Sequence, residues 1–184
     1  MNTVIGDGNG RRNFTVEVAH VQDAGNQLQQ VRVAFEQCQE TGPKLKASLI
    51  DHWVPAIAPT CELVKWFNFD EEKWYEFERR YRRELKTVPT QCECLRSLAC
   101  RTVVTLVYMN GNARRNAAIV LKKHLIELEC QRRWDAGWMV GGHTSPVRNE
   151  IEQCGGLWFG WHKAWMMPDR ESCDYIRSLL PGDF

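Results

Sequence analysis

The stretch Val103-Val104-Thr105-Leu106-Val107-Tyr108 decides the fold, because it is a continuous run of apolar and β-branched residues without polar alternation. Such a run is typical of a strand that is buried on both faces. Strands of this kind belong to parallel sheets whose two faces are covered by helices. We therefore predict a central parallel strand at residues 103–108.

A strongly amphipathic helix is predicted before this strand. Asp70 is a suitable N-cap, and apolar residues then recur at the spacing of one helix face: Trp74, Phe77, Tyr81 and Leu85. The opposite face carries arginines interleaved with glutamates, a pattern that usually forms a solvated surface. Arg80 on that face is also a candidate anion ligand.

Other elements are predicted around these two. Strands are expected at 14–21 and 31–35, a helix through Leu45, Leu49 and Trp53 up to Pro55, a short helix capped by Thr60, and helices at 90–100 and 117–129. Strands joined by helical crossovers predict an α/β fold, a small three-layer Rossmann-like domain with a mostly parallel sheet.

The composition changes after Arg133. Five of the 8 tryptophans lie from Trp134 onward. We expect a flexible N-terminus at 1–13, an α/β domain at 14–133 and a small α+β module at 134–184. The module is predicted to contain a strand at 138–141, a helix at 146–153, two short strands within 157–167 and a helix at 170–180.

Charge is unevenly spread, although the net charge is only +1. Residues 71–133 carry a local charge of +6, whereas residues 138–184 carry −2. The middle of the chain can meet an anion, and the tail is a poor electrostatic match for one.

No apolar run approaches a membrane span, and no secretory signal is evident, so we expect a cytoplasmic protein with reduced thiols. We expect no cofactor and no metal, because the cysteine spacing differs from that of zinc sites.

Residues 51–127 contain a series of ordered motifs: Asp51-His-Trp53, Ala58-Pro59-Thr60-x-Glu62-Leu63-x-Lys65-Trp66-Phe67, Phe77-x-x-Arg80-Tyr81-x-x-Glu84-Leu85, Val104-Thr105-Leu106-x-Tyr108, and Asn116-Ala117 followed by Leu125. On these motifs, about residues 14–130 resemble the YeaO-like family (domain of unknown function 488). The resemblance implies the α/β fold. It also implies a ligand pocket that involves Glu36, Gly42, Arg80, Tyr81 and Asn116.

One family motif is altered in this chain. Where the family carries Asp-Arg-x-Trp-Pro-Arg-Gly, this sequence has Glu36-Gln-Cys-Gln-Glu-Thr-Gly42, so both arginines are missing. Arginines at the C-terminal end of a strand would bind an anion. Their loss favours a binding protein over an active enzyme. Glu36 and Cys38 remain weak catalytic candidates.

The tail contains three motifs: Gly142-x-Thr144-x-Pro146-x-Arg148, Gly155-Gly156-x-Trp158 and Lys163-x-Trp165-x-x-Pro168. On these motifs it resembles a bacterial and phage module similar in plan to the HARP domain, which is associated with DNA transactions. Trp158 and Trp165 can stack a base, or they can form the core of so small a unit. Arg148 and Lys163 are candidate contacts for nucleic acid or a partner.

Three functions remain open. The leading one is a non-catalytic accessory protein of a bacterium or its phage, associated with nucleic acid or a nucleotide. The alternative is a protein-interaction module, such as a phage or mobile-element inhibitor of a host or defence protein. The third is a nucleotide-processing enzyme with Glu36, Arg80, Tyr81 and Asn116 in its pocket. The oligomeric state stays undetermined, and no membrane partner is expected.

Overall fold

The computed structural model describes residues 13–23, 30–35 and 50–180. Within these ranges the chain forms two compact units. The first comprises residues 15–126, and the second comprises residues from 127 onward together with Asn13 and Phe14. No helix in the described ranges is both long enough and apolar enough to cross a membrane.

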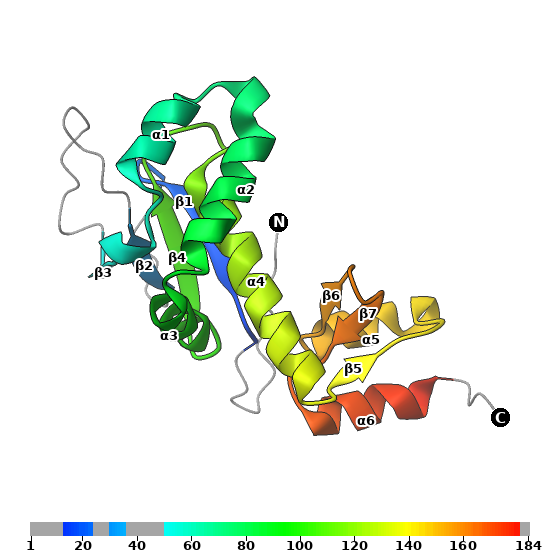
Figure 1. The fold of residues 1–184 in the computed structure, drawn as a ribbon. Helices are drawn as coiled ribbons and strands as arrows, with labels where there is room; N and C mark the ends of the chain where they lie inside the picture. Colours follow the sequence, from blue (N-terminus) through cyan, green and yellow to red (C-terminus); the bar gives the residue numbers. More distant parts are fainter. Residues whose placement is uncertain (1–12, 24–29, 36–49, 181–184) are drawn as a thin grey trace. The chain divides into compact units, whose positions relative to one another are not determined.

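A parallel sheet forms the centre of the first unit (Figure 1). Its strands are β1 (Val16–His20), β2 (Gln30–Ala34), β3 (His52–Trp53) and β4 (Val103–Tyr108), in the spatial order β1-β4-β2-β3. Leu106 on β4 lies opposite Val18 on β1 and Val33 on β2. The predicted central strand is therefore confirmed, and Val104 and Leu106 are fully buried within it.

Helices flank this sheet. They are η2 (Pro55–Ile57), α1 (Cys61–Phe67), η3 (Glu71–Lys73), α2 (Trp74–Leu85), α3 (Pro89–Ala99) and α4 (Ala117–Asp135). Thr60 caps α1 by accepting a hydrogen bond from Leu63 N, and the whole apolar stripe of α2 is buried. The α/β, Rossmann-like plan predicted from the sequence is confirmed.

Two expected element boundaries differ from the structure. Trp53 lies in β3 and not in a helix, because His52–Trp53 pairs with the edge of β2 and Val54 N donates to Ala34 O at 2.8 Å. Leu45 and Leu49, predicted on the same helix, lie outside the described residues. At the other end, α4 runs six residues beyond the expected Glu129 and ends at Asp135.

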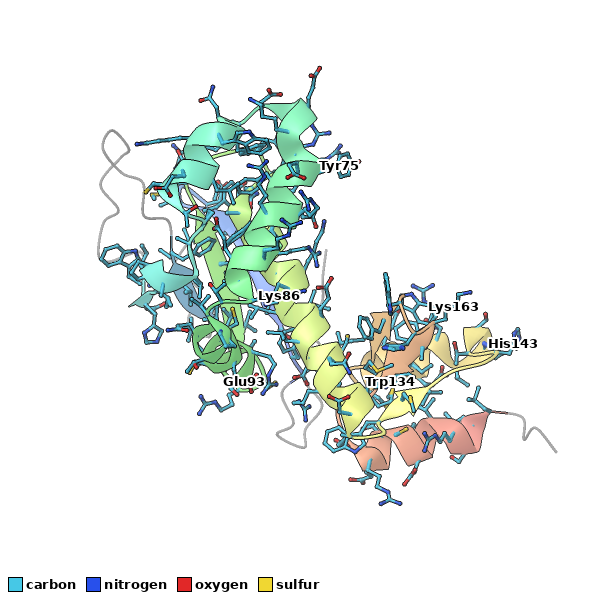
Figure 2. The ribbon with its side chains drawn as sticks, viewed as in Figure 1. Tyr75, Lys86, Glu93, Trp134, His143 and Lys163 are labelled. Atoms are coloured by element: carbon cyan, nitrogen blue, oxygen red, sulfur yellow. The ribbon has the colours of Figure 1, made fainter. Side chains whose placement is uncertain are left out.

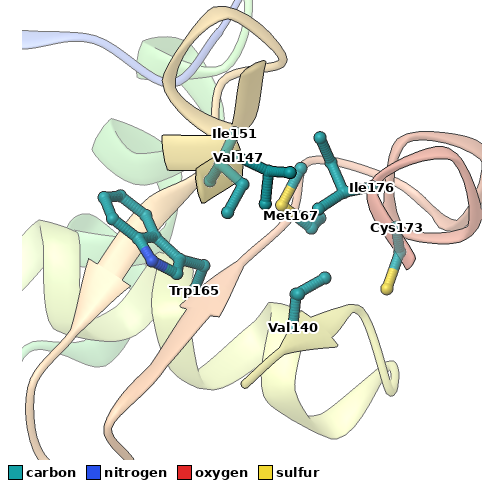
Figure 3. Close-up of a cluster of buried hydrophobic side chains, with 7 residues drawn as sticks. All are labelled: Val140, Val147, Ile151, Trp165, Met167, Cys173 and Ile176. Carbon is teal, nitrogen blue, oxygen red and sulfur yellow. The ribbon is translucent and has the colours of Figure 1, made fainter. Parts of the chain in front are cut away.

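The second unit is a small antiparallel sheet with helices. Its strands β5 (Met139–Val140), β6 (Leu157–Phe159) and β7 (Ala164–Met166) have the order β5-β7-β6, and its helices are η4 (Ser145–Val147), α5 (Arg148–Gln153) and α6 (Arg170–Leu179). Figure 3 shows the side chains of its core converging: Val140, Val147, Ile151, Trp165, Met167, Cys173 and Ile176. These elements match the predicted α+β module.

Candidate functional site

A cavity of about 280 Å³ lies in the second unit. Its lining residues are Thr144, Ser145, Arg148, Trp158 and Trp165. Three of the four site residues predicted for the tail therefore come together at one place. Arg148 lies at the start of α5, and Trp158 and Trp165 lie on the adjacent strands β6 and β7. The two hydroxyl residues, Thr144 and Ser145, lie in the segment that leads into α5.

Trp165 belongs to both the core and the cavity. Its side chain is only 8% exposed and packs in the cluster of Figure 3. The indole Nε1 donates a hydrogen bond to Thr144 Oγ1 at 3.2 Å, which satisfies its polar group and fixes the ring. Trp165 therefore belongs to the hydrophobic core and also forms part of the cavity wall.

Trp158 differs from Trp165 in its exposure. The two residues lie directly opposite each other in the β6–β7 ladder, and their rings meet edge to face with centroids 5.4 Å apart. Trp158 is 50% exposed, although an indole of this size is usually largely buried. Trp158 therefore offers free aromatic surface on a rigid support.

Arg148 provides the positive charge of the cavity. Its Nε donates to Glu152 Oε1 at 2.8 Å, and its guanidinium carbon lies 5.9 Å from the centre of the Trp165 ring. Neither terminal guanidinium nitrogen bonds another residue of the described ranges. Because the Glu152 pair is solvent-exposed and weak, the guanidinium can turn toward a ligand.

The fourth predicted residue, Lys163, lies outside the cavity lining. It belongs to the turn between β6 and β7, where Figure 2 shows its position. Its side chain is exposed, and it pairs with no carboxylate among the described residues. Its backbone φ of 49° lies in the left-handed region that non-glycine residues seldom adopt.

The candidate residues of the first unit are engaged in its structure. Tyr81 is fully buried, and its hydroxyl donates to Ile57 O at 2.6 Å. Asn116 is buried ahead of α4, where its side-chain oxygen accepts from Ile119 N at 3.0 Å. These contacts account for both polar groups as parts of the fold.

Arg80 is the accessible member of that set. Its Nε donates to Glu76 Oε1 at 2.7 Å, and its guanidinium carbon lies 4.2 Å from the centre of the Trp66 ring. The remaining members of the predicted first-unit site, Glu36, Cys38 and Gly42, lie outside the described residues.

Two buried cysteines of the described ranges lack the features of a nucleophile. Burial raises the pKa of the Cys92 and Cys130 thiols to about 11, so both are protonated near neutral pH. The expectation that every thiol is reduced is wrong at Cys61, which is disulfide-bonded. Within the described ranges no group of three or more His, Cys, Asp or Glu side chains could hold a metal ion.

Two lining residues were missed from the sequence. Thr144 and Ser145 stand in the quoted tail motif, but only Arg148 was singled out from that segment. The usable signal was the pair of hydroxyls directly before Pro146. Small hydroxyl residues next to an aromatic pair can orient a planar ligand by hydrogen bonding.

Residues 15–141 match the family described as the inactive DUF488-N3 subclade. The chain belongs to this family. An uncharacterised protein of Mycobacterium tuberculosis, Rv3073c, is 31% identical over 114 residues, covering 62% of this chain and 96% of the relative. The uncharacterised protein YeaO of Escherichia coli is 26% identical over 115 residues, covering 62% of this chain and 100% of the relative. No solved structure matches the chain.

The cavity lies in the part of this DUF488-N3 protein that the family match does not span. Thr144, Ser145, Arg148, Trp158 and Trp165 all follow residue 141, where the match ends. The similarity of this tail to the HARP domain remains a prediction. Membership in the subclade therefore bears on the first unit and on the first residues of the second, 127–141, and the cavity must be interpreted from its own chemistry.

Proposed function

We propose that this protein is a non-catalytic binding protein whose second unit takes the base of a nucleotide or nucleic acid into the cavity lined by Trp158 and Trp165. The observation that carries the proposal is the half-exposed Trp158 ring, which the buried Trp165 supports edge to face. Aromatic faces presented in this way stack planar bases.

The polar groups around the rings suit the same ligand class. The hydroxyl groups of Thr144 and Ser145 can donate to and accept from the edge of a base. Arg148 disfavours a cationic ligand such as a quaternary ammonium group, and it can stack on a base or meet a phosphate. A cavity of about 280 Å³ admits a small planar group.

The absence of catalysis is supported by two observations. The described residues of the lining include no carboxylate, histidine or thiol, so among them no ordinary general base or activated nucleophile is present. The family that includes the first unit is described as inactive. Binding without turnover is the function that fits both.

The experiment is a titration of fluorescently labelled nucleotides and oligonucleotides with the full chain at low salt, followed by anisotropy. Trp158→Ala should weaken binding by on the order of tenfold or more, the loss of one stacked base. Trp53→Ala is the matched control, because Trp53 is also exposed, at 65%, but lies in the first unit. Equal effects of the two substitutions would contradict the proposal.

The arginine is tested in the same assay. Arg148→Ala should weaken binding, whereas Arg170→Ala should leave it unchanged. Arg170 is a matched control because it lies in the same unit and, like Arg148, pairs with a carboxylate one helical turn later. Absence of any binding at low salt would remove the nucleic-acid function altogether.

A protein-interaction role is the second candidate, and one observation favours it. Trp161 is 89% exposed on the same β6–β7 hairpin as Trp158, and exposed aromatic residues are enriched at protein interfaces. A phage or mobile-element inhibitor of a host protein would have this kind of surface. Mass spectrometry of proteins that co-purify with the native chain, compared with a Trp158→Ala, Trp161→Ala double variant, tests this role.

A further inference from the structure

The turn of the β6–β7 hairpin presents a second tryptophan beside the cavity. Two hydrogen bonds close this turn: His162 N donates to Phe159 O at 3.1 Å, and Lys163 N donates to Gly160 O at 3.2 Å. Trp161 lies between these bonded residues and is 89% exposed. A ring of this size, held so far into solvent on a closed turn, stabilises the fold little and is available to a ligand.

Gly160, the residue before Trp161, lies close to the cavity tryptophan Trp158. A Cβ atom placed on Gly160 would lie 3.5 Å from Trp158 Nε1. The indole of Trp158 therefore reaches from its contact with Trp165 to the backbone that precedes Trp161. Trp161 directly follows this contact in the chain, so the cavity tryptophan Trp158 and the exposed Trp161 belong to the same hairpin.

The neighbour on the other side anchors the turn. His162 stacks on Trp134, with ring centroids 3.8 Å apart and planes at 14°, and it meets Phe159 edge to face. Trp134 lies near the end of α4, so the turn is attached to a helix and not only to its own strands. The Trp161 ring is consequently exposed on a supported turn.

Lys163 places a cation at the same turn. It pairs with no carboxylate in the described part of the chain, whereas Arg148 and Arg170 of this unit each pair with one. Its left-handed backbone, with φ at 49°, is a conformation in which glycine would be less strained. A side chain kept at a strained position beside an exposed tryptophan points to a use for its charge.

We infer that the second unit binds a single strand of nucleic acid across several nucleotides, with one base in the cavity, a neighbouring base on Trp161 and a backbone phosphate at Lys163. The inference rests on the proposed function and adds the class of ligand. A duplex is excluded from this arrangement, because its base faces are stacked on one another and only their edges are reachable. The low count of cations also favours stacking over phosphate contacts.

The experiment is an NMR titration of the full chain, in which the indole N–H signals of Trp158 and Trp161 are assigned from alanine variants. The probes are a thymidine mononucleotide, an oligothymidine of eight nucleotides and a blunt-ended duplex of two separate complementary strands. We expect the mononucleotide to shift the Trp158 signal alone and the oligothymidine to shift both signals. We expect the oligothymidine to bind at least about tenfold more tightly, the gain from one further stacked base.

Trp161→Ala should remove that tenfold gain and leave the mononucleotide affinity unchanged. Tyr175→Ala is the control, because Tyr175 is 51% exposed on α6 of the same unit and should change neither affinity. Lys163→Gly keeps the left-handed turn and removes the charge, so it should weaken oligothymidine binding alone.

The outcomes separate this inference from the proposed function. An oligothymidine that binds no more tightly than the mononucleotide, or equally well after Trp161→Ala, overturns the inference and leaves the cavity function standing. A duplex that binds as tightly as the single strand overturns it as well. No shift of Trp158 with any probe removes the proposed function together with the inference.

Discussion

Arg133 Nε donates a hydrogen bond to Glu129 Oε1 at 2.7 Å, and both side chains are buried, with exposures of 2% and 1%. The same guanidinium donates through Nη1 to Gly155 O and Met166 O, both at 2.9 Å. Arg133 thereby attaches the last turns of α4 to the β7 strand that carries Trp165. A residue outside the cavity lining thus holds the strand that carries one of the lining tryptophans.

Arg133→Met is expected to destabilise the protein by about 3 kcal/mol or more, because it leaves a buried carboxylate and two buried carbonyl oxygens without this donor. Urea denaturation followed by circular dichroism measures the change. Arg132→Ala is the control: Arg132 also bonds Glu129, but its side chain is 39% exposed. The control should cost much less, and equal costs would contradict the role given to Arg133.

Glu129 should make the protein sensitive to acid. Burial alone would raise the pKa of its carboxyl group, but hydrogen bonds from Arg132 and Arg133 outweigh burial and lower the pKa from 4.5 to about 2. A lowered folded-state pKa adds stability above pH about 4.5, and this stability is lost as the pH falls toward about 2. The urea concentration at the midpoint of unfolding should therefore decrease as the pH is lowered from about 4.5 to about 2.

One variant and the addition of salt isolate this effect. Glu129→Gln should lower the urea midpoint at neutral pH and flatten its dependence on pH in the acidic range. The pKa of Glu76 is also lowered to about 2, by hydrogen bonds from Arg79 and Arg80, but this group lies on the surface of α2. Added salt should therefore reduce the acid sensitivity that Glu76 contributes and leave that of Glu129 largely intact.

Leu106→Ala should lower the free energy of unfolding by about 2–5 kcal/mol, because it removes a fully buried side chain from the centre of the parallel sheet. Val103→Ala is the control at the partly exposed start of the same strand. The free energy of unfolding from urea titration compares the two. A cost under about 1 kcal/mol for Leu106→Ala would contradict its central place.

Tyr81→Phe is expected to lower the free energy of unfolding by about 1–3 kcal/mol, because the buried carbonyl of Ile57 loses the hydrogen bond from the tyrosine hydroxyl. Arg80→Ala, one residue earlier, should change stability by no more than about 1 kcal/mol, since its pair with Glu76 is exposed. Arg80→Ala should weaken any ligand binding by the first unit more than Tyr81→Phe does. A negligible loss of stability in Tyr81→Phe would contradict a structural role for this hydrogen bond.

The elements with strong local signals were predictable from the sequence. The unbroken apolar run of β4 and the stripe of α2 each follow from side-chain periodicity. Trp53 was misplaced because its two-residue strand is defined by pairing with Ala34, which leaves no periodic pattern. A short edge strand is determined by its neighbour more than by its own residues.

The site was predictable only in part, for a related reason. Arg148, Trp158 and Trp165 were candidates because they stand in the tail motifs, and all three line the cavity. The buried role of Arg133 was not, because an arginine at the end of a helix usually contacts solvent. The two carbonyls that it satisfies lie 22 and 33 residues further along the chain. Contacts at such separations are not visible in local sequence.

The salt dependence of nucleic-acid binding should be shallow. Residues 138–184 carry four basic and six acidic residues, and Arg148 and Lys163 are the basic residues placed near the two exposed tryptophans. Each phosphate contact contributes roughly 0.7 to the log–log slope for a single strand, so the magnitude should be about 2 or less. Replacing Arg148 and Lys163 together by alanine should weaken binding and flatten the slope without unfolding the protein.

Trp165→Ala provides the contrast to that double variant. Because Trp165 is 8% exposed and packs in the core, its removal should lower both binding and the free energy of unfolding, the latter by about 3–5 kcal/mol. Trp158→Ala, at a half-exposed ring, should lower binding with a much smaller loss of stability. Anisotropy at several salt concentrations, combined with urea denaturation of each variant, measures both quantities. A slope much steeper than about 2 would place the contact on the more basic residues 71–133 and not on the tryptophan cavity.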